Sequence, residues 1–113
     1  MDIKAVLDNL VVSLQSLNPD KIILFGSYAN GNPDGDSDID LMVILDDSHV
    51  SKSYQERLDK KLHVRTLVLE INRKVPLDIL VYSKEELNII KKHGNKFIAD
   101  IEKTGKVIYE KTG

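Results

Sequence analysis

Hydrophobic residues follow two different spacings along this chain, and the spacing changes from one segment to the next. From Ile3 to Leu17 they recur at every third or fourth position, which predicts an amphipathic helix that ends before Asn18-Pro19. Lys21 to Phe25 is instead a short apolar run that stops at Gly26, as expected of a buried strand leading into a turn. The chain therefore begins with a predicted helix followed by a predicted strand.

A second predicted strand carries two carboxylates on one face. A period of two places the odd-numbered positions from Ile39 to Leu45, all apolar, on one side of the strand, and Asp38 and Asp40 on the other. The Cα atoms of the two aspartates would lie about 6.6 Å apart, from about 3.3 Å of rise per residue. Carboxylate oxygens at that spacing can converge on one cation or bracket a pair, and Mg²⁺ prefers such ligands.

A third carboxylate interrupts the apolar run from Pro76 to Tyr82. Asp78 is costly to bury in such a run without a partner. If this run is a strand beside the one that carries Asp38 and Asp40, the three acids form a cluster whose repulsion is relieved only by bound cations or by protonation. The sequence thus predicts a site built around a divalent metal.

The remaining segments predict three helices and one more strand. Tyr54 to Asn72 has a helical apolar pattern and is long enough to cross between the second and third strands. Ser83 and Glu86 have the spacing of a capping box, so a helix should begin after Ser83. Phe97 to Lys103 is predicted to be helical and Lys106 to Tyr109 to be an edge strand.

Strands separated by helices favour an α/β domain with a three- to four-stranded mixed sheet packed with helices. The 113 residues form one predicted domain, residues 1–113, without a separate substrate-binding domain.

Composition excludes several other kinds of protein. The chain has no cysteine, which excludes disulfides and thiolate metal sites. It has neither an apolar run long enough to span a membrane nor a charged-then-apolar leader, so the simplest expectation is a cytoplasmic protein without membrane contact.

Charge is distributed unevenly between the two halves. Residues 1–47 contain 2 basic and 9 acidic residues, a net charge of −7, and residues 48–113 contain 14 basic and 9 acidic residues, a net charge of +5. The candidate site lies in the acidic half, where Asp34 and Asp36 add to the repulsion of a triphosphate, so metal dependence should be strict. The same acidity disfavours binding of nucleic acid. Lys91, Lys92 and Lys96 are either an ordinary solvated face or a contact for an acidic partner or RNA.

Gly26-Ser27, the Asp38-Ile39-Asp40 strand and the later Asp78 together resemble the nucleotidyltransferase superfamily that includes DNA polymerase beta. The match is closest to minimal nucleotidyltransferases, small proteins often found beside a helical HEPN partner. The resemblance implies that Gly26 and Ser27 hold the triphosphate of ATP and that Asp38 and Asp40 ligate two Mg²⁺ ions. It also implies that Asp78 ligates one of these ions and assists removal of the acceptor proton. Because the resemblance, and not the periodicity, specifies the order of the strands, it further implies that the two acid-bearing strands lie next to each other near the centre of the sheet and leave the opposite sheet face open to a nucleotide.

The same resemblance implies a Mg²⁺-dependent nucleotidyltransferase that moves AMP from ATP to a hydroxyl of a HEPN-type toxin, and so acts as an antitoxin. The alternative is a non-catalytic antitoxin or adaptor of the same fold that inhibits its partner by binding alone. Many relatives have Arg or Lys after the Gly-Ser pair, whereas this chain has Tyr28-Ala29-Asn30, which favours the alternative. The sequence leaves the oligomeric state open, a homo-oligomer included.

Several residues also have ordinary structural interpretations. Gly-Ser pairs often mark turns, Asp-x-Asp occurs by chance, and Asp78 could be a paired structural acid. Tyr28 and Tyr82 either stack on a base or belong to the core. The three histidines, His49, His63 and His93, have no ligand spacing and are interpreted as surface or packing residues.

Overall fold

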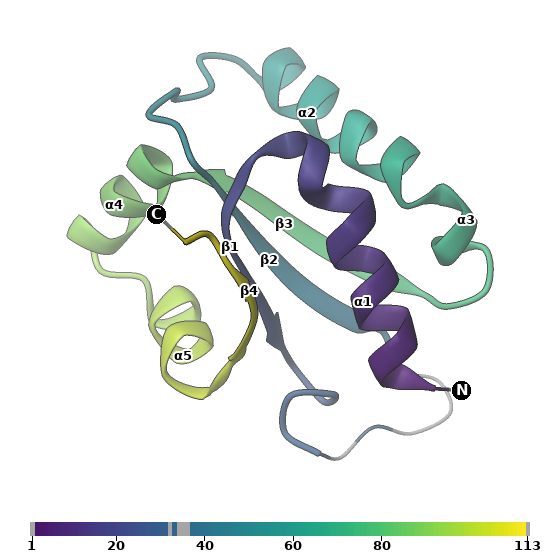
Figure 1. Ribbon diagram of the computed structural model, residues 1–113. Coiled ribbons are helices and arrows are strands. Elements are labelled where there is room, and N and C mark those ends of the chain that lie inside the picture. The colour runs from purple at the N-terminus through teal and green to yellow at the C-terminus, as the bar shows by residue number, and fades with distance from the viewer. Residues whose placement is uncertain (1, 32, 34–36, 113) are drawn as a thin grey trace.

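A four-stranded sheet lies at the centre of the molecule, with helices packed against both faces (Figure 1). The computed structural model describes residues 2–31, 33 and 37–112. In chain order the elements are α1 (Ile3–Leu14), a 3₁₀ helix (Gln15–Leu17), β1 (Pro19–Phe25), β2 (Ile39–Leu45), α2 (Tyr54–Leu67), α3 (Leu69–Asn72), β3 (Leu77–Ser83), α4 (Lys84–Lys92), α5 (Lys96–Thr104) and β4 (Lys106–Glu110). The predicted α/β class is confirmed.

The strands are ordered β3-β2-β1-β4 across the sheet. β1 is antiparallel to β2 and β4, whereas β2 is parallel to β3, so the sheet is mixed as predicted. The parallel pair needs a crossover, which α2 and α3 provide. One expectation is wrong: the acid-bearing strand β3 lies at the edge of the sheet, because β4 joins beside β1 and leaves β3 with a single neighbour.

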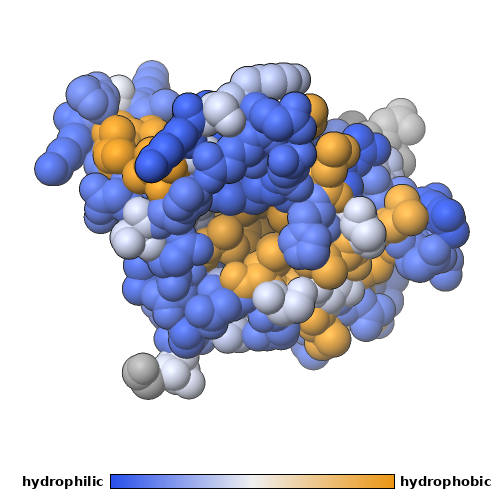
Figure 2. Space-filling view, turned by 90° about the horizontal axis from the view of Figure 1, so that it is seen from above, coloured by the Kyte–Doolittle hydropathy of each residue, from blue (hydrophilic) through white to orange (hydrophobic). Residues whose placement is uncertain are grey.

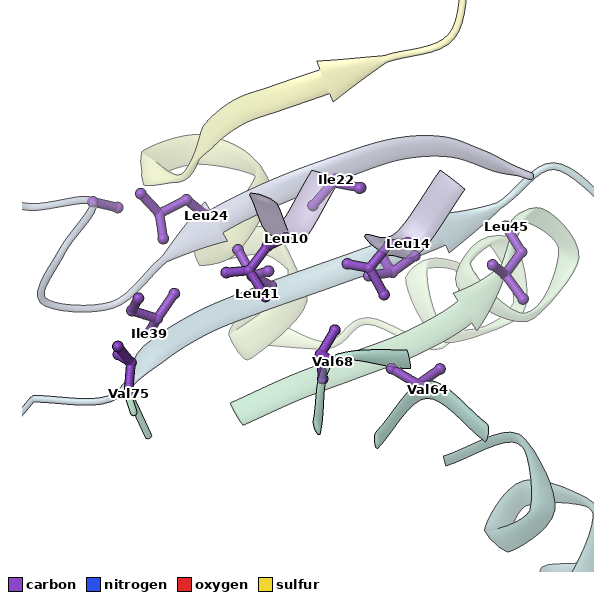
Figure 3. Close-up of a cluster of buried hydrophobic side chains, with 12 residues drawn as sticks. Leu10, Leu14, Ile22, Leu24, Ile39, Leu41, Leu45, Val64, Val68 and Val75 are labelled. Carbon is purple, nitrogen blue, oxygen red and sulfur yellow. The ribbon is translucent and has the colours of Figure 1, made fainter. Parts of the chain in front are cut away.

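The larger part of the core lies between one sheet face and the helices α1 and α2. Figure 3 shows this cluster, in which Leu10 and Leu14 of α1 are fully buried over the sheet. The odd-numbered apolar residues of β2, predicted to share a face, all point into it. Truncating a fully buried leucine of this kind to alanine typically costs about 2–5 kcal/mol. The strand period therefore correctly identified the main core face.

A second, smaller core covers the other face of the sheet. Met42 and Ile44 of β2 pack there against Leu87 of α4 and against Ile98 and Ile101 of α5. Strand β2 is thus buried on both sides, which explains why its sequence is almost continuously apolar after Asp40. The expectation of an open sheet face is wrong, because α4 and α5 cover it beyond the acidic end.

The single helix predicted for residues 54–72 is divided into two. At Val68 the backbone leaves the helical region (φ −108°, ψ 13°), which separates α2 from α3. Val64 and Val68 are both buried, and Ile71 of α3 also packs against the same core. Val64, Val68 and Ile71 have the i, i+4, i+7 spacing of a single helix face, so all three contact the core although the helix is interrupted at Val68.

The capping box at the start of α4 is confirmed. Ser83 Oγ accepts a hydrogen bond from the Glu86 N–H at 3.1 Å, and Glu86 Oε1 accepts one from the Ser83 N–H at 2.9 Å. Two N–H groups at the helix end are satisfied in this way.

The molecular surface is mostly polar. In the view of Figure 2, hydrophilic residues dominate, and hydrophobic residues gather in a hollow near the middle of the face. None of the helices in the described part of the chain combines the length and apolar character needed to cross a membrane.

Candidate functional site

Gly26 ends β1 and stands directly against Asp40. Its φ of +75° lies in the left-handed region, which disfavours side chains. A Cβ atom placed on Gly26 would collide with the carboxylate of Asp40. Phe25 is the register partner of Asp40 across β1 and β2, so the turn begins beside this acid. Glycine is therefore required here both for the turn and for the space that Asp40 occupies.

The turn after Gly26 keeps hydrogen-bond donors available. The N–H groups of Ala29 and Asn30 both donate to the Gly26 carbonyl, each at 3.1 Å, which closes the turn. Within the described ranges, the N–H groups of Ser27 and Tyr28 and the Ser27 hydroxyl have no protein partner. These groups can donate to an anion such as a phosphate oxygen.

Asp40 and Asp78 lie side by side on neighbouring strands. They are register partners in the parallel pair of β2 and β3, and residues paired in this way project from the same sheet face. Asp38 precedes β2 by one residue and, by the strand period, belongs to that face as well. The structure thus brings together the three acids that the sequence singled out, at the end of the strands where β1 enters the Gly26 turn.

The three carboxylates interact electrostatically. The pKa of Asp40 is raised above its usual value, first by burial and then by the negative charges of Asp78 and Asp38. Burial disfavours the ionised form of a carboxyl group, and so does a nearby like charge. Asp40 is therefore the member of the group whose charge most needs compensation.

No ion pair within the described residues supplies that compensation. In the part of the chain that the structure describes, the side chains of Asp38, Asp40 and Asp78 form no ion pair. Other acids such as Asp46 and Glu86 do have lysine partners. Uncompensated carboxylates that repel one another suit a divalent cation, which prefers oxygen ligands.

The acids are neighbours, but their oxygens do not yet surround a common point. Among the described residues, no group of three or more Asp, Glu, His or Cys side chains is close enough together to hold a metal ion. Asp38 and Asp78 are exposed, so their side chains have room to change rotamer. The donor set fits a hard cation in chemistry, and binding would require the carboxylates to turn toward it.

Phe97 is a residue near this site that sequence reasoning missed. Its ring makes an edge-to-face contact with Phe25, with centroids 5.8 Å apart and planes at 85°. Phe97 is 54% exposed although it is a large apolar residue, and Phe25 lies beside Asp40. An exposed aromatic ring can stack on a nucleobase. The signal available in the sequence was a large aromatic residue beside Lys96 at the start of the predicted helix, next to the apolar positions Ile98 and Ile101 that form its buried face.

The other candidate residues are structural or on the surface. Tyr28 and Tyr82 are half-buried and pack against the two cores, which agrees with their structural interpretation. The three histidines, His49, His63 and His93, are exposed, and His49 contacts Glu56. They are surface residues, as one of the two sequence interpretations held.

The turn around Tyr28 brings no basic residue to the site. Lys61 and Arg65 of α2 line a cavity that Asp78 also lines, but neither forms an ion pair within the described ranges. Lys91 pairs with Glu102 at 3.1 Å, while Lys92 and Lys96 are exposed. Asp34 and Asp36, which were expected to add negative charge near the site, lie outside the described residues.

Comparison with known proteins gives one family and several similar structures. The sequence model of the family described as "Polymerase beta, Nucleotidyltransferase" matches residues 8–112. No curated protein sequence matches the chain. A crystal structure of a toxin-antitoxin with AMP-PNP is 18% identical, with a TM-score of 0.57 over 94% of this chain and 74% of that one.

A second similar structure is a mutant of the toxin-antitoxin MntA-HpeT in which two aspartates are replaced by glutamate. It is 16% identical, with a TM-score of 0.54 over 94% of this chain and 74% of that one. At these identities the likeness shows a shared fold.

Proposed function

Because this chain belongs to the polymerase beta nucleotidyltransferase family, we propose that it transfers AMP from ATP to an acceptor hydroxyl in a Mg²⁺-dependent reaction. The observation that carries the proposal is the packing of Gly26 against Asp40, with Asp78 in register beside it. This arrangement sets phosphate-binding donors next to uncompensated carboxylates. A purely structural turn would need glycine for its positive φ, but it would not need repelling acids packed against it.

The Gly26-Ser27 turn would bind the triphosphate. The N–H groups of Ser27 and Tyr28 and the Ser27 hydroxyl are donors without protein partners among the described residues. The absent Cβ of Gly26 lets a phosphate approach the backbone closely. The chain thus offers neutral donors at the turn, which orient a phosphate without neutralising its charge.

Asp38 and Asp40 would each ligate Mg²⁺, and Asp78 would hold one ion from the neighbouring strand. Two such ions, when bound, stabilise the incoming and the departing oxygens of the transfer. The acceptor oxygen attacks the α-phosphorus, the bond from that phosphorus to the bridging oxygen breaks, and pyrophosphate leaves. Asp78 is exposed at the sheet edge, where its carboxylate can accept the acceptor's proton.

We further propose that the acceptor belongs to a partner protein, a HEPN-type toxin, and that the chain acts as its antitoxin. The site is at the end of the strands, and two of its three acids are exposed, so an acceptor carried by another molecule has access. Similar folds occur in toxin-antitoxin structures, one of them with AMP-PNP. Mass spectrometry of a candidate partner after incubation with ATP should find the added mass of AMP.

A second candidate function is inhibition of the partner by binding alone. The observation in its favour is that the Tyr28-Ala29-Asn30 turn supplies no cation to a triphosphate. The electrostatic repulsion among Asp38, Asp40 and Asp78 opposes this candidate, because a protein that binds no cation would keep that destabilising repulsion without any compensation. Calorimetry separates the two candidates, since a non-catalytic antitoxin should bind no ATP in the presence of Mg²⁺.

The decisive test replaces Asp40 by asparagine. Asp40→Asn keeps the shape of the side chain and removes its charge, so the protein should fold normally and lose at least about 100-fold of its Mg²⁺-dependent transfer rate, the typical scale for one essential electrostatic group. Labelled ATP and the partner protein provide the measurement.

Asp100→Asn is the matched control, because Asp100 is exposed on α5, is not among the acids that raise the pKa of Asp40, and forms no side-chain ion pair among the described residues. This control should keep full transfer. Undiminished transfer by Asp40→Asn would refute the assignment.

A further inference from the structure

The outer edge of β3 has a short stretch of unpaired backbone. The Pro76 carbonyl accepts a hydrogen bond from the Ile39 N–H of β2 at 3.0 Å, and backbone groups of successive strand residues point to opposite sides. The even-numbered residues of β3 therefore face β2, and the odd-numbered ones face outward. Because β3 is an edge strand, no further strand covers those outward groups.

Both ends of this edge are closed by side chains, but the middle is open. The Leu77 N–H donates to Asn72 Oδ1 at 3.1 Å, and the Ser83 N–H donates to Glu86 Oε1 at 2.9 Å. For the residues that the structure describes, the N–H groups of Ile79 and Val81 between them have no partner. Two residues with free N–H and C=O groups can pair with an added strand.

A trough runs along this open edge. One cavity, of about 230 Å³, lies between α2 and the Asp78 end of β3. A second, of about 380 Å³, continues toward Tyr82 and α4. Lys61, Ile79 and Val81 line both, so the two hollows are joined along the strand. The trough therefore has β3 as its floor, α2 as one wall and the start of α4 at its far end.

The α2 wall of the trough is positively charged. Arg57, Lys61 and Arg65 line it at intervals of four residues, which corresponds to about 6 Å of helix rise. None of the three forms an ion pair in the described part of the chain, whereas Lys60 beside them is paired with Glu86 at 3.4 Å. Alternate residues of an extended strand lie about 6.6 Å apart, close to the same interval.

We propose that the trough binds an extended acidic segment of a partner protein, which adds to β3 as a fifth strand. The N–H and C=O groups of Ile79 and Val81 would pair with its backbone. Carboxylates at alternate positions would meet Arg57, Lys61 and Arg65. Charges that only protect a sheet edge normally stand on the edge strand itself, whereas here the β3 residues from Ile79 to Tyr82 are uncharged and the charges are on α2.

The test uses the whole chain, without nucleotide or metal, and an eight-residue peptide of alternating Thr and Glu. Binding should weaken as salt is added, since it depends on ion pairs. Hydrogen exchange of the Ile79 and Val81 amides should slow when the peptide is bound. The Lys61→Glu, Arg65→Glu double variant should weaken binding by about tenfold or more, from the loss and reversal of two charges.

The control is the Lys92→Glu, Lys103→Glu double variant, which makes the same change of charge on α4 and α5 outside the trough. It should bind the Thr-Glu peptide nearly as well as the parent chain. A Thr-Lys peptide should not bind. Val81→Pro removes one outward N–H while sparing the ladder to β2, and should also weaken binding if circular dichroism shows that it folds.

Three results of the peptide experiment would overturn the proposal. These are equal binding of the Thr-Lys peptide, equal loss in the two double variants, and slowed exchange at amides other than those of the β3 edge. Self-association of the chain with protection of Ile79 and Val81 would also overturn it, because the occupant would then be a second copy. The peptide experiment contains neither nucleotide nor metal, so its outcomes do not test AMP transfer. The proposal for the β3 edge and the proposed transferase activity can therefore fail separately.

Discussion

Gly26 has no Cβ atom, and only for that reason can the Asp40 carboxylate pack directly against it. The residue has a positive φ, and a Cβ there would overlap the Asp40 carboxylate. Gly94 has nearly the same φ, +74°, but nothing lies within 4 Å of where its Cβ would be. An alanine at Gly94 would therefore introduce backbone strain alone, whereas an alanine at Gly26 would introduce the same strain and also displace Asp40.

Gly94→Ala should lower the free energy of unfolding by about 1–2 kcal/mol, the cost of a left-handed alanine. Gly26→Ala should cost more, because Asp40 must also move. Only Gly26→Ala should abolish Mg²⁺-dependent ATP binding. Urea denaturation and calorimetry measure the two effects, and retained ATP binding by Gly26→Ala would contradict the role given to this turn.

Asp40 should make stability depend on pH in an unusual direction. Its pKa is raised in the folded protein above the usual 3.8, chiefly by burial. Its charge therefore destabilises the fold at neutral pH, and this penalty disappears below the unfolded pKa, where the group is protonated in both states. Asp40→Asn should raise the free energy of unfolding at neutral pH and leave it unchanged near about pH 3. Denaturation at a series of pH values tests this, with Asp100→Asn expected to show no such gain.

The sequence identified the acids and the glycine because each breaks a local pattern. Asp40 and Asp78 interrupt apolar runs, Asp38 lies two positions before Asp40 on the same strand face, and Gly26 ends an apolar run. Phe97 could not be connected to the site in this way, because its partner Phe25 lies 72 positions earlier in the chain. The free N–H groups of Ile79 and Val81 could not be predicted either, because local sequence patterns do not show which strand lies at the edge of the sheet.

Among the elements, α4 shows how closely local sequence can determine structure. Its capping box is formed by residues three positions apart and was predicted correctly. Tertiary contacts add to it, since Glu86 also accepts from the Ser51 N–H at 3.0 Å and pairs with Lys60. The pKa of Glu86 is lowered by these partners, against the opposing effect of burial. The capping residue Glu86 thus also holds the loop before α2 in place, through its hydrogen bond with the Ser51 N–H.

Ser83→Ala should destabilise the protein by about 1–2 kcal/mol, because the cap is fully buried and its loss leaves the Glu86 N–H without a partner. Ser53 caps α2 in the same way, accepting from the Glu56 N–H at 3.1 Å, but is exposed. Ser53→Ala should cost roughly half as much, since water can replace the lost bond. Equal losses in thermal denaturation would argue against the importance of burial.

At the scale of the whole molecule, Asp46 connects three parts of the chain that are distant in sequence by forming ion pairs. Its carboxylate follows β2 and pairs with Lys84 at the start of α4 and with Lys111 in the tail after β4, each at 2.7 Å. Hydrogen bonds from these lysines lower the pKa of Asp46 to about 2. The Asp46 side chain is only partly exposed (27%), so salt should screen its effect in part.

A pKa lowered in the folded state stabilises the fold above the unfolded pKa and loses that effect as pH falls. Asp46 should therefore stabilise the protein above its usual pKa of 3.8, with the effect lost toward about pH 2. Asp46→Asn should flatten this part of the stability profile. Hydrogen exchange should find the Lys111 amide, bonded to the Asp20 carbonyl at 2.8 Å, less protected in the variant. If the free energy of unfolding of Asp46→Asn depended on pH below 3.8 as that of the parent chain does, the two ion pairs would contribute nothing to stability.

Taken alone, the sequence determined the elements and the residues able to do chemistry, because helix period, strand period and capping act over a few neighbouring positions. It placed Asp38 and Asp40 on one strand face and predicted the family that the comparison confirmed. Only the tertiary structure decided that β3 is an edge strand, that α4 and α5 cover the acidic face beyond the site, and that α2 bends at Val68. These features depend on which distant segments bury their apolar surface together, and that choice is made by the packing of the whole chain.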